Sequence, residues 1–323
     1  MDNKEWFAQA KFGLMVHWGL YSLLGGEWQG KRMGDMIGEW AQSYFRIPNK
    51  TYHKLTDCFN PIFFDADEWV ATAKAAGAQY LVVTSKHHDG FALFGSEASP
   101  FNVCDATPFG RDVIGELSDA CRRQGLKLGL YYSQSLDWSE EHGGGYDEES
   151  RLHINCGKAA WSNDWDYPDY TKKDFSICFE KKIKPQVKEI LTKYGDLCLI
   201  WFDTPRAITA EQSQELYDMV KHYQPDCLVN SRIGNELGDY QSTRDNEIPD
   251  DKKDCLFESP ATLNGTWGYK SYDNDWKSPA RVLEIKNHLN ERGINYLLNV
   301  GPDHLGRFPA PAVEILKEVG RQL

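Results

Sequence analysis

Long apolar runs are absent from this sequence of 323 residues. No segment reaches the about 18 uninterrupted apolar residues that suggest a membrane-spanning helix, and we therefore expect no membrane span. The amino-terminal residues also lack an apolar stretch followed by a small-residue cleavage site, so no secretory signal peptide is expected. Low-complexity linkers and short repeats are missing too. We predict a single catalytic domain over residues 1–323.

Positive charge is also scarce. The chain has 36 Lys and Arg against 48 Asp and Glu, which gives a formal net charge of −12. A nucleic-acid partner would favour a basic face, and a peripheral membrane anchor would favour a polybasic cluster. The sequence therefore predicts neither a nucleic-acid partner nor attachment to a membrane, and the acidic balance is explained by solubility.

Paired cysteines are the third absence. The 8 cysteines are scattered and form no C-x-x-C pair. Cys198 and Cys227 lie in apolar runs, where a free thiol behaves as a small hydrophobic group. We read the cysteines as reduced thiols of a cytoplasmic protein and not as zinc ligands. We expect neither a metal nor another cofactor.

A repeated alternation of helix and strand is the strongest pattern that the sequence does contain. Five helical segments are each followed by a short run too apolar to alternate, which is typical of parallel strands buried on both faces. The expected strands are 11–19, 80–85, 126–133, 196–203, 227–232 and 294–302, with helices at 65–77, 111–125, 179–195, 210–224, 280–293 and 309–323. Two weaker strands are expected between 239 and 275. This order predicts a (β/α)8 TIM-like barrel. A doubly wound open sheet is the alternative, but no Gly-rich phosphate loop follows the first strand.

Polar residues follow the expected strands. In a barrel, catalytic groups come from the carboxyl ends of the strands and from the loops after them. These positions hold His17-Trp18, Lys86 to Asp89, Tyr131-Tyr132, Trp201 with Asp203, Asn230 to Arg232, and Asn299. Residues 134–175 have no clear periodicity, and we expect this long segment to overhang the same rim.

The chemistry that these residues suggest is carboxylate chemistry. His87 and His88 are adjacent, so on a strand they would point to opposite faces and would not bind one metal ion. No G-x-S-x-G elbow or Cys-His signature is present. Glycoside hydrolysis instead requires two carboxyl groups. Asp203 is one candidate, and the others follow in later loops, where each is equally compatible with a solvated charge: Glu236, Asp239, Asp245, Glu247 and Glu258.

Several sequence blocks resemble those of one known family. The blocks "KFGLMVHWGLYSLLGGEW", "YLVVTSKHHDGFALF", "GLYYSQSLDW", "LIWFD", "VNSRIGN", "GDYQSTRDNEIP", "TWGY" and "INYLLNVGPDHLGRFP" are similar, in order, to α-L-fucosidases of glycoside hydrolase family 29. The resemblance extends from about residue 5 to about residue 310. It implies an enzyme with a barrel fold that acts by a retaining double displacement.

The resemblance also implies roles for individual residues. The nucleophile is Asp203 and the acid/base residue is Asp245, with Glu258 as the second candidate and Glu236 at the position used by another branch of the family. Residues that bind fucose are His17, Glu39, Trp40, His87, His88, Tyr131, Trp201, Arg232 and Trp267. Two of these assignments have an alternative in the sequence. Tyr132 is the alternative to Tyr131, and Glu27-Trp28 is a second Glu-Trp pair besides Glu39-Trp40.

The resemblance further suggests a substrate. Many members carry a β-sandwich after the barrel, but this sequence ends 14 residues after its last matching block and resembles the small branch without it. That branch includes intracellular bacterial enzymes that favour α-1,6-linked fucosyl-N-acetylglucosamine. We therefore expect a fucosylated oligosaccharide or glycoconjugate as substrate, a homo-oligomer, and an apolar patch of Phe and Trp against the fucose methyl group. Transfer of fucose to a sugar acceptor, or sugar binding without catalysis, are the alternatives.

Overall fold

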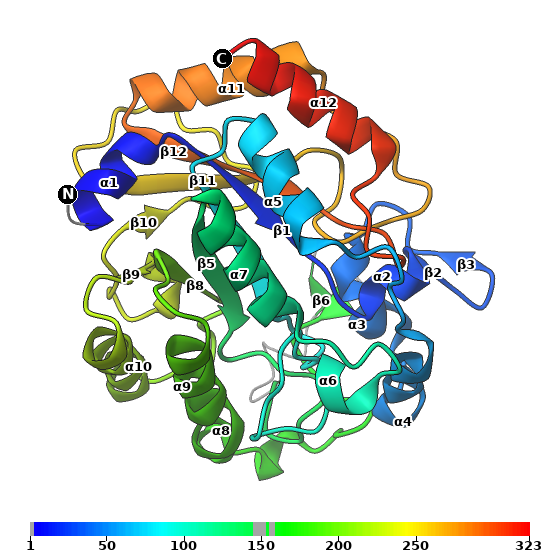
Figure 1. Ribbon diagram of the computed structural model, residues 1–323. Helices are drawn as coiled ribbons and strands as arrows, with labels where there is room; N and C mark the ends of the chain where they lie inside the picture. Colours follow the sequence, from blue (N-terminus) through cyan, green and yellow to red (C-terminus); the bar gives the residue numbers. More distant parts are fainter. Residues whose placement is uncertain (1–2, 145–152, 155–158) are drawn as a thin grey trace.

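The centre of the molecule is one parallel sheet of eight strands (Figure 1). The computed structural model describes residues 3–144, 153–154 and 159–323. In the order in which they pair, the strands are β10 (Gln241–Ser242), β11 (Phe257–Thr262), β12 (Ile294–Val300), β1 (Phe12–Val16), β4 (Tyr80–Lys86), β5 (Lys127–Ser133), β8 (Leu199–Asp203) and β9 (Leu228–Val229). A parallel bridge between Asn230 and Tyr240 links the chain just after β9 to the chain just before β10. The sheet therefore curls into the predicted TIM-like barrel, and the two weak strands, β10 and β11, are confirmed.

Long helices cover the outside of the sheet. They are α5 (Ala66–Ala75), α7 (Val113–Gln124), α9 (Lys184–Lys193), α10 (Ala210–Tyr223), α11 (Pro279–Glu291) and α12 (Ala310–Arg321). Local chemistry sets their ends: Asp65 accepts a hydrogen bond from the Glu68 amide at the start of α5, and Gly125 ends α7 with a φ of 70°. Helix α12 packs against both α5 and α11, so the helical layer continues across the two ends of the sequence.

The barrel departs from the ideal repeat on one side. Between residues 228 and 257, all of which the structure describes, the connections contain no α-helix and only the short turn η6 (Ser231–Ile233). This stretch is rich in Asp and Asn and has no apolar periodicity, so a crossover helix would bury nothing. Strand β9 is also shorter than the predicted 227–232, because the Asn230 side chain bonds the backbone of Phe202 on both its amide and its carbonyl.

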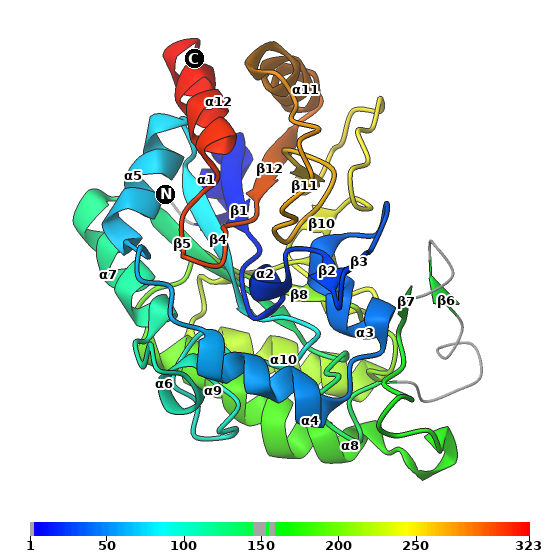
Figure 2. The ribbon, with the colours of Figure 1, turned by 90° about the vertical axis from the view of Figure 1, so that its right-hand side faces the viewer.

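The remaining elements lie in the loops and at the ends of the barrel (Figure 2). They are α1 (Asn3–Ala10), α2 (Tyr21–Leu24), β2 (Glu27–Trp28), β3 (Lys31–Arg32), η1 (Gly38–Trp40), α3 (Ala41–Phe45), α4 (Asn49–Tyr52), η2 (His53–Cys58), α6 (Val103–Ala106), β6 (His153–Ile154), β7 (Ala159–Ala160), η4 (Tyr170–Lys172), α8 (Phe175–Cys178) and η5 (Phe179–Ile183). The helix predicted over 179–195 is observed as η5 and α9 in succession, and α8 extends it toward the amino terminus.

Side chains on alternate strand positions form two separate cores. One lies between the sheet and the helices and includes Leu14, Leu81 and Ile200. The other fills the inside of the barrel, where Tyr80 and Tyr240 contact Phe7 of α1 at the amino-terminal end. This aromatic filling packs the amino-terminal end of the barrel interior, and the pocket that gathers the predicted site residues opens toward the carboxyl ends of the strands.

A buried ionic cluster holds the long segment after β5 against the barrel. The Asp137 carboxylate accepts from Lys86 Nζ and Lys182 Nζ, each at 2.9 Å, and all three side chains are almost completely buried. Breaking such a pair would leave an uncompensated charge in the interior, which is strongly destabilising. Residues 145–152 and 155–158 of the predicted overhang lie outside the described residues, but the described part does reach the rim, because Trp161 lines the pocket there.

Two further expectations concern the whole described chain. The described cysteines, namely Cys58, Cys104, Cys121, Cys178, Cys198, Cys227 and Cys255, are all free thiols. Within residues 3–144, 153–154 and 159–323, every helix is too short or too polar to cross a membrane.

Candidate active site

One pocket at the carboxyl end of the barrel gathers nearly all of the residues predicted from the sequence. With its open mouth it encloses about 480 Å³. Its walls include His17, Glu39, Trp40, His87, His88, Tyr131, Trp201, Asp203, Arg232, Asp245 and Trp267, which is every predicted site residue except Glu258. These residues come from the ends of β1, β4, β5, β8, β9, β10 and β11 or from the loops after them. The expectation that functional side chains lie at the carboxyl ends of the barrel strands therefore predicted their location, whereas their chemical roles remain predictions.

Asp203 ends strand β8 at a strained turn. The next residue, Thr204, has a φ of 60°, a left-handed conformation that is costly for a β-branched residue. The Asp203 amide donates to Gln134 Oε1 at 2.7 Å, and Gln134 Nε2 donates to the carbonyl of Arg232 at 2.8 Å. Neighbouring strands thus fix the backbone around Asp203, and the carboxylate is held at the edge of the pocket with only 16% of its side chain exposed.

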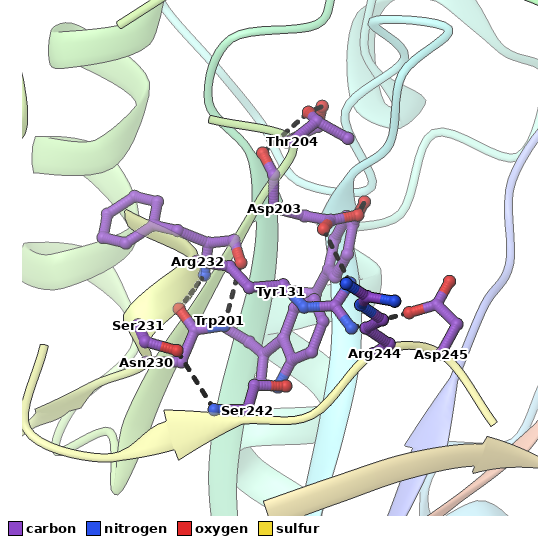
Figure 3. A network of polar contacts seen from close by, with 12 residues as sticks. Tyr131, Trp201, Asp203, Thr204, Asn230, Ser231, Arg232, Ser242, Arg244 and Asp245 are labelled. Atoms are coloured by element: carbon purple, nitrogen blue, oxygen red, sulfur yellow. Dashed lines mark hydrogen bonds and ion pairs between the residues drawn. The ribbon is translucent and has the colours of Figure 1, made fainter. Parts of the chain in front are cut away.

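Arg232 lies between two carboxylates (Figure 3). Its Nη1 donates to Asp203 Oδ1 at 3.1 Å, and its Nη2 donates to Asp245 Oδ1 at 2.6 Å. Although burial opposes the positive charge, Asp245 and Asp203 raise the pKa of Arg232 above its ordinary value. The guanidinium is therefore permanently charged, and it fixes the two carboxylates next to one another. Asp245 is half-exposed, which leaves it accessible from the mouth of the pocket.

Tyr131 and Trp201 complete the surroundings of Asp203. The Tyr131 hydroxyl donates to Asp203 Oδ2 at 2.8 Å, and burial together with the negative charge of Asp203 raises the pKa of Tyr131 well above its usual value. The Tyr131 ring stacks on Trp201 with centroids 5.5 Å apart and planes 18° apart. Tyr131 is thus a neutral donor to the carboxylate, and flat aromatic surface lies beside it.

The hydrogen bonds of His17 determine which of its nitrogens is free to accept. Asn299 Nδ2 donates to the carbonyl of Trp267, so Asn299 Oδ1 is the atom that faces His17 Nδ1, at 2.7 Å. His17 Nδ1 must then carry the proton. Burial lowers the pKa of His17 to about 4, so the ring is neutral and Nε2 is an acceptor. A sugar hydroxyl is a suitable donor to it.

His88 is arranged in the same way. The Ser133 hydroxyl donates to the Leu136 carbonyl, so it accepts from His88 Nδ1 at 2.8 Å, and His88 Nε2 is left as an acceptor 4.0 Å from Asp203 Oδ2. Burial lowers the pKa of both His87 and His88 well below 6.5. The expectation that these two rings face opposite ways was wrong. Strand β4 ends at Lys86, so strand alternation does not reach them, and their ring centroids lie only 3.9 Å apart.

Glu39 supplies a buried carboxyl group to the pocket wall. Its Oε2 accepts from the Gly268 amide at 2.7 Å, and burial raises the pKa of Glu39 to about 8. At neutral pH it is largely protonated and offers an O–H donor, which complements the histidine acceptors. The competing pair, Glu27-Trp28, lies instead in the β2–β3 ribbon, where Glu27 pairs with Arg32.

Several sequence candidates lie outside the pocket lining, and Asp239 and Glu247 are among them. Tyr132 donates to Gln186 Oε1 at 2.8 Å on the outer side of the sheet, and Glu236 is exposed in the loop after η6. Glu258 is completely buried inside the barrel, where it accepts hydrogen bonds from Tyr80 and Trp201. Of the loop and strand carboxylates weighed as partners of Asp203, the geometry favours Asp245.

The pocket also includes residues that the sequence did not single out: Met15, Ile37, Trp161 and Thr204. Met15 and Ile37 provide apolar surface next to Trp267, so the expected apolar patch contains Trp but draws its aliphatic part from these two side chains and not from Phe. Of these four residues, only Thr204 could have been noticed in the sequence, because Thr204-Pro205 marks the point where the strand must end. In the part of the chain that the structure describes, no three His, Cys, Asp or Glu residues are grouped as a metal site would require.

Comparison with known proteins gives a consistent result. The sequence model of the family described as alpha-L-fucosidase matches residues 1–323. The alpha-L-fucosidase of Dictyostelium discoideum is 28% identical over 98% of this chain and 69% of its own length. The tissue alpha-L-fucosidase of Mus musculus is 29% identical over 99% of this chain and likewise 69% of its own length. This chain thus spans about two thirds of these relatives.

Solved structures resemble the chain more closely. The alpha-L-fucosidase AlfC from Lactobacillus casei, in complex with its α-L-fucose product, superposes with a TM-score of 0.94 at 51% identity and covers 100% of this chain and 98% of its own. An AlfC variant in complex with Fucα(1,6)GlcNAc has a TM-score of 0.92 at 49% identity over 98% of this chain and 97% of that chain. The enzyme from Vibrio sp. strain EJY3 has a TM-score of 0.91 at 38% identity and covers 99% of this chain but 54% of its own.

Proposed function

The chain belongs to the alpha-L-fucosidase family and is a glycosidase, and from this we propose that it hydrolyses terminal α-L-fucosyl linkages with retention of configuration. The observation that carries the proposal is the pair of carboxylates, Asp203 and Asp245, that share the Arg232 guanidinium at the pocket. Hydrolysis with retention requires one carboxylate as nucleophile and a second that acts as acid and then as base.

In the first step, an oxygen of the Asp203 carboxylate attacks the anomeric carbon of fucose, and the bond to the leaving oxygen breaks. Asp245 gives its proton to that oxygen, so the products are an ester between fucose and Asp203 and a free alcohol. In the second step, Asp245 removes a proton from water, which attacks the same carbon and releases Asp203 as a carboxylate. Tyr131 and Arg232 stabilise the leaving carboxylate through their bonds to its two oxygens.

The pocket suggests how fucose is selected. His17 and His88 offer neutral acceptors and Glu39 offers a donor, so sugar hydroxyls are bound without a metal ion. The apolar surface of Met15, Ile37 and Trp267 suits the methyl group that fucose carries in place of a 6-hydroxyl.

We further propose α-1,6-linked fucosyl-N-acetylglucosamine as a substrate. The support is the similarity to AlfC, of which one variant is known in complex with Fucα(1,6)GlcNAc. Transfer of fucose to an N-acetylglucosamine acceptor is the second candidate, because other AlfC variants are described as fucosyltransferase mutants. The two reactions share the fucosyl-enzyme and differ only in the acceptor.

One experiment tests both the stereochemistry and the linkage. Hydrolysis of Fucα(1,6)GlcNAc followed by proton NMR should first release the α-anomer of L-fucose, before mutarotation, and kcat/KM should exceed that for α-1,2-, α-1,3- and α-1,4-linked fucosides. Initial release of the β-anomer would exclude a retaining mechanism. Addition of excess N-acetylglucosamine then measures how much of the intermediate is transferred instead of hydrolysed.

We also propose that the protein is cytoplasmic and acts as a homo-oligomer. Exposed free thiols at Cys58 and Cys255 suit a reducing compartment. An apolar patch at Ile62 and Phe63, which are 63% and 51% exposed, supports association of two copies. The groove beside it carries both signs of charge, in Asp65, Glu68 and Glu314 and in Arg307 and Lys317, so it is complementary to a second copy of itself.

Phe63→Glu should therefore shift the protein toward the monomer in sedimentation velocity, because it places charge in the centre of the apolar patch. Ile177→Glu is the matched control, since Ile177 is also exposed but lies on helix α8, outside this groove. A wild-type protein that sediments as a monomer at micromolar concentration would contradict the proposal.

A further inference from the structure

Glu258 has no role in the mechanism above, yet its carboxylate is completely buried in the barrel beneath the pocket. Both of its oxygens are used. Oε1 accepts from the indole Nε1 of Trp201 at 2.8 Å, and Oε2 accepts from the Tyr80 hydroxyl at 2.6 Å. Burying a carboxyl group is costly, so a position filled by an acid with two donors aimed at it requires an explanation.

The indole that Glu258 holds supports both groups that bind the proposed nucleophile. The Trp201 ring stacks on Tyr131, and the Arg232 guanidinium lies over it with 4.6 Å from its central carbon to the ring centroid. Tyr131 donates to Asp203 Oδ2, and Arg232 donates to Asp203 Oδ1. Figure 3 shows Trp201, Tyr131 and Arg232 gathered beside Asp203. A change in the tilt of the indole would therefore displace both donors.

We propose that Glu258 is a positioning residue for the nucleophile, which acts by anchoring the indole of Trp201 and through it Tyr131, Arg232 and the carboxylate of Asp203. The inference rests on the proposed role of Asp203. It differs from a general-acid role, because Glu258 does not line the pocket and both of its oxygens are already bonded. It also differs from a role in stability alone, because it predicts loss of kcat in protein that is folded.

Three variants separate these roles. Glu258→Leu removes both acceptors, whereas Glu258→Gln keeps an acceptor for the Trp201 indole and presents an amide to the Tyr80 oxygen. Tyr80→Phe is the control, since it removes only the bond to Oε2 and lies outside the pocket lining. We expect Glu258→Leu to lower kcat by roughly 10²-fold, as small displacements of reacting groups do, with a much smaller change in the inhibition constant of L-fucose. Glu258→Gln and Tyr80→Phe should retain most of the wild-type kcat.

The leaving group distinguishes positioning from acid catalysis. The loss in Glu258→Leu should be the same for 4-nitrophenyl α-L-fucoside and for Fucα(1,6)GlcNAc, and azide should not reverse it. A loss confined to the poor leaving group, or recovery with azide, would assign Glu258 to acid/base chemistry. Equal losses in the Leu and Gln variants would show that the charge of Glu258 acts directly and would overturn the proposal.

A double-mutant cycle tests the path through Trp201. If Glu258 acts through the indole, its replacement should have little further effect on kcat once Trp201 is Phe, whereas additive losses would overturn the proposal. Should Glu258→Leu fail to fold by circular dichroism, Glu258→Met takes its place in the cycle. The role of Asp203 is tested separately by azide rescue of its Gly variant, so additive losses with rescue intact would refute the positioning role alone.

Discussion

Replacement of Asp203 by Gly should reduce the hydrolysis of 4-nitrophenyl α-L-fucoside by roughly 10⁴- to 10⁶-fold, the scale of loss seen when the nucleophile of a covalent catalyst is removed. The reason is that no other carboxylate in the described pocket occupies the place of Asp203. Glu39 is bonded to the Gly268 amide, and burial raises its pKa to about 8, so it is largely neutral at pH 7. Asp245 lies at the mouth of the pocket, and the role proposed for it is that of the acid/base residue.

Azide should restore turnover of this variant and give β-L-fucosyl azide. The glycine at position 203 leaves an empty space where the carboxylate was. A small anion that enters this space attacks the anomeric carbon from the face opposite to the leaving group. Tyr131 and Arg232, which bind the carboxylate in the wild type, remain to bind the anion. The product is identified by NMR, and its configuration reports the face of attack.

Glu236→Gln is the matched control for the Asp203 variant, because it removes an exposed acid outside the pocket lining and should keep wild-type rates. Normal activity in Asp203→Gly, or an azide product of α configuration, would show that Asp203 is not the nucleophile. Either result would overturn the proposed mechanism while leaving the membership of the family intact.

Much of the barrel and of its rim could be predicted from the sequence, because both depend on local patterns. Runs such as residues 196–203 are typical of strands buried on both faces, and an expected helix precedes five of the six runs. Once the strands are parallel, their carboxyl ends share one rim. His17, Asp203 and Arg232 could therefore be placed together although they are far apart in the chain.

The role of Glu258 was harder to predict because the sequence does not reveal where its strand begins. Residues 239–275 have weak periodicity, so a carboxylate there was read as part of a rim loop. The structure places Glu258 at the second position of β11, which continues to Thr262 before it reaches the rim. Glu258 thus lies near the start of β11 and not in the loop after it, which puts its side chain beneath the pocket and not in the pocket wall. The adjacent histidines gave a different error, since strand alternation was applied to His87 and His88 although both lie beyond the end of β4 at Lys86.

The remaining wall residues depend on tertiary structure alone. Met15 lies in a strand that reads as ordinary core, Ile37 precedes a short turn, and Trp161 belongs to a segment without periodicity. They meet in the pocket because three separate loops and strands converge there. No local pattern distinguishes such a side chain from one that fills the core.

In the Asp245→Ala variant, kcat/KM for Fucα(1,6)GlcNAc should fall by roughly 10²- to 10⁴-fold, the usual contribution of general acid catalysis. For a fucoside with a much more acidic leaving group the same parameter should change little, because that oxygen departs without a proton. Equal losses for both substrates would exclude Asp245 as the acid. Glu258→Gln provides the comparison, since its effect should not depend on the leaving group.

Asp245→Asn separates the proton from the position of Arg232. The Asn oxygen can still accept from Arg232 Nη2, as Asp245 Oδ1 does at 2.6 Å, but the amide cannot supply a proton. If the Ala and Asn variants lose the same activity toward Fucα(1,6)GlcNAc, the proton accounts for the loss. If Asn restores the rate, Asp245 acts by holding Arg232 and not as an acid.

Azide should accelerate both Asp245 variants and give α-L-fucosyl azide. Here the nucleophile Asp203 is intact, so the fucosyl-enzyme forms, and azide attacks it without needing the base that water requires. In the wild type, Asp203 loses its charge when it is esterified, so of the two carboxylates that Arg232 binds only Asp245 can then be an anion. The positive charge of Arg232 therefore favours the ionised form of Asp245, which is the form that must deprotonate water. Two inversions retain the configuration, whereas the single inversion in Asp203→Gly reverses it. Opposite configurations of the two azide products would thus assign the two carboxylates to their faces of the sugar, and identical configurations would refute the pairing of Asp203 with Asp245.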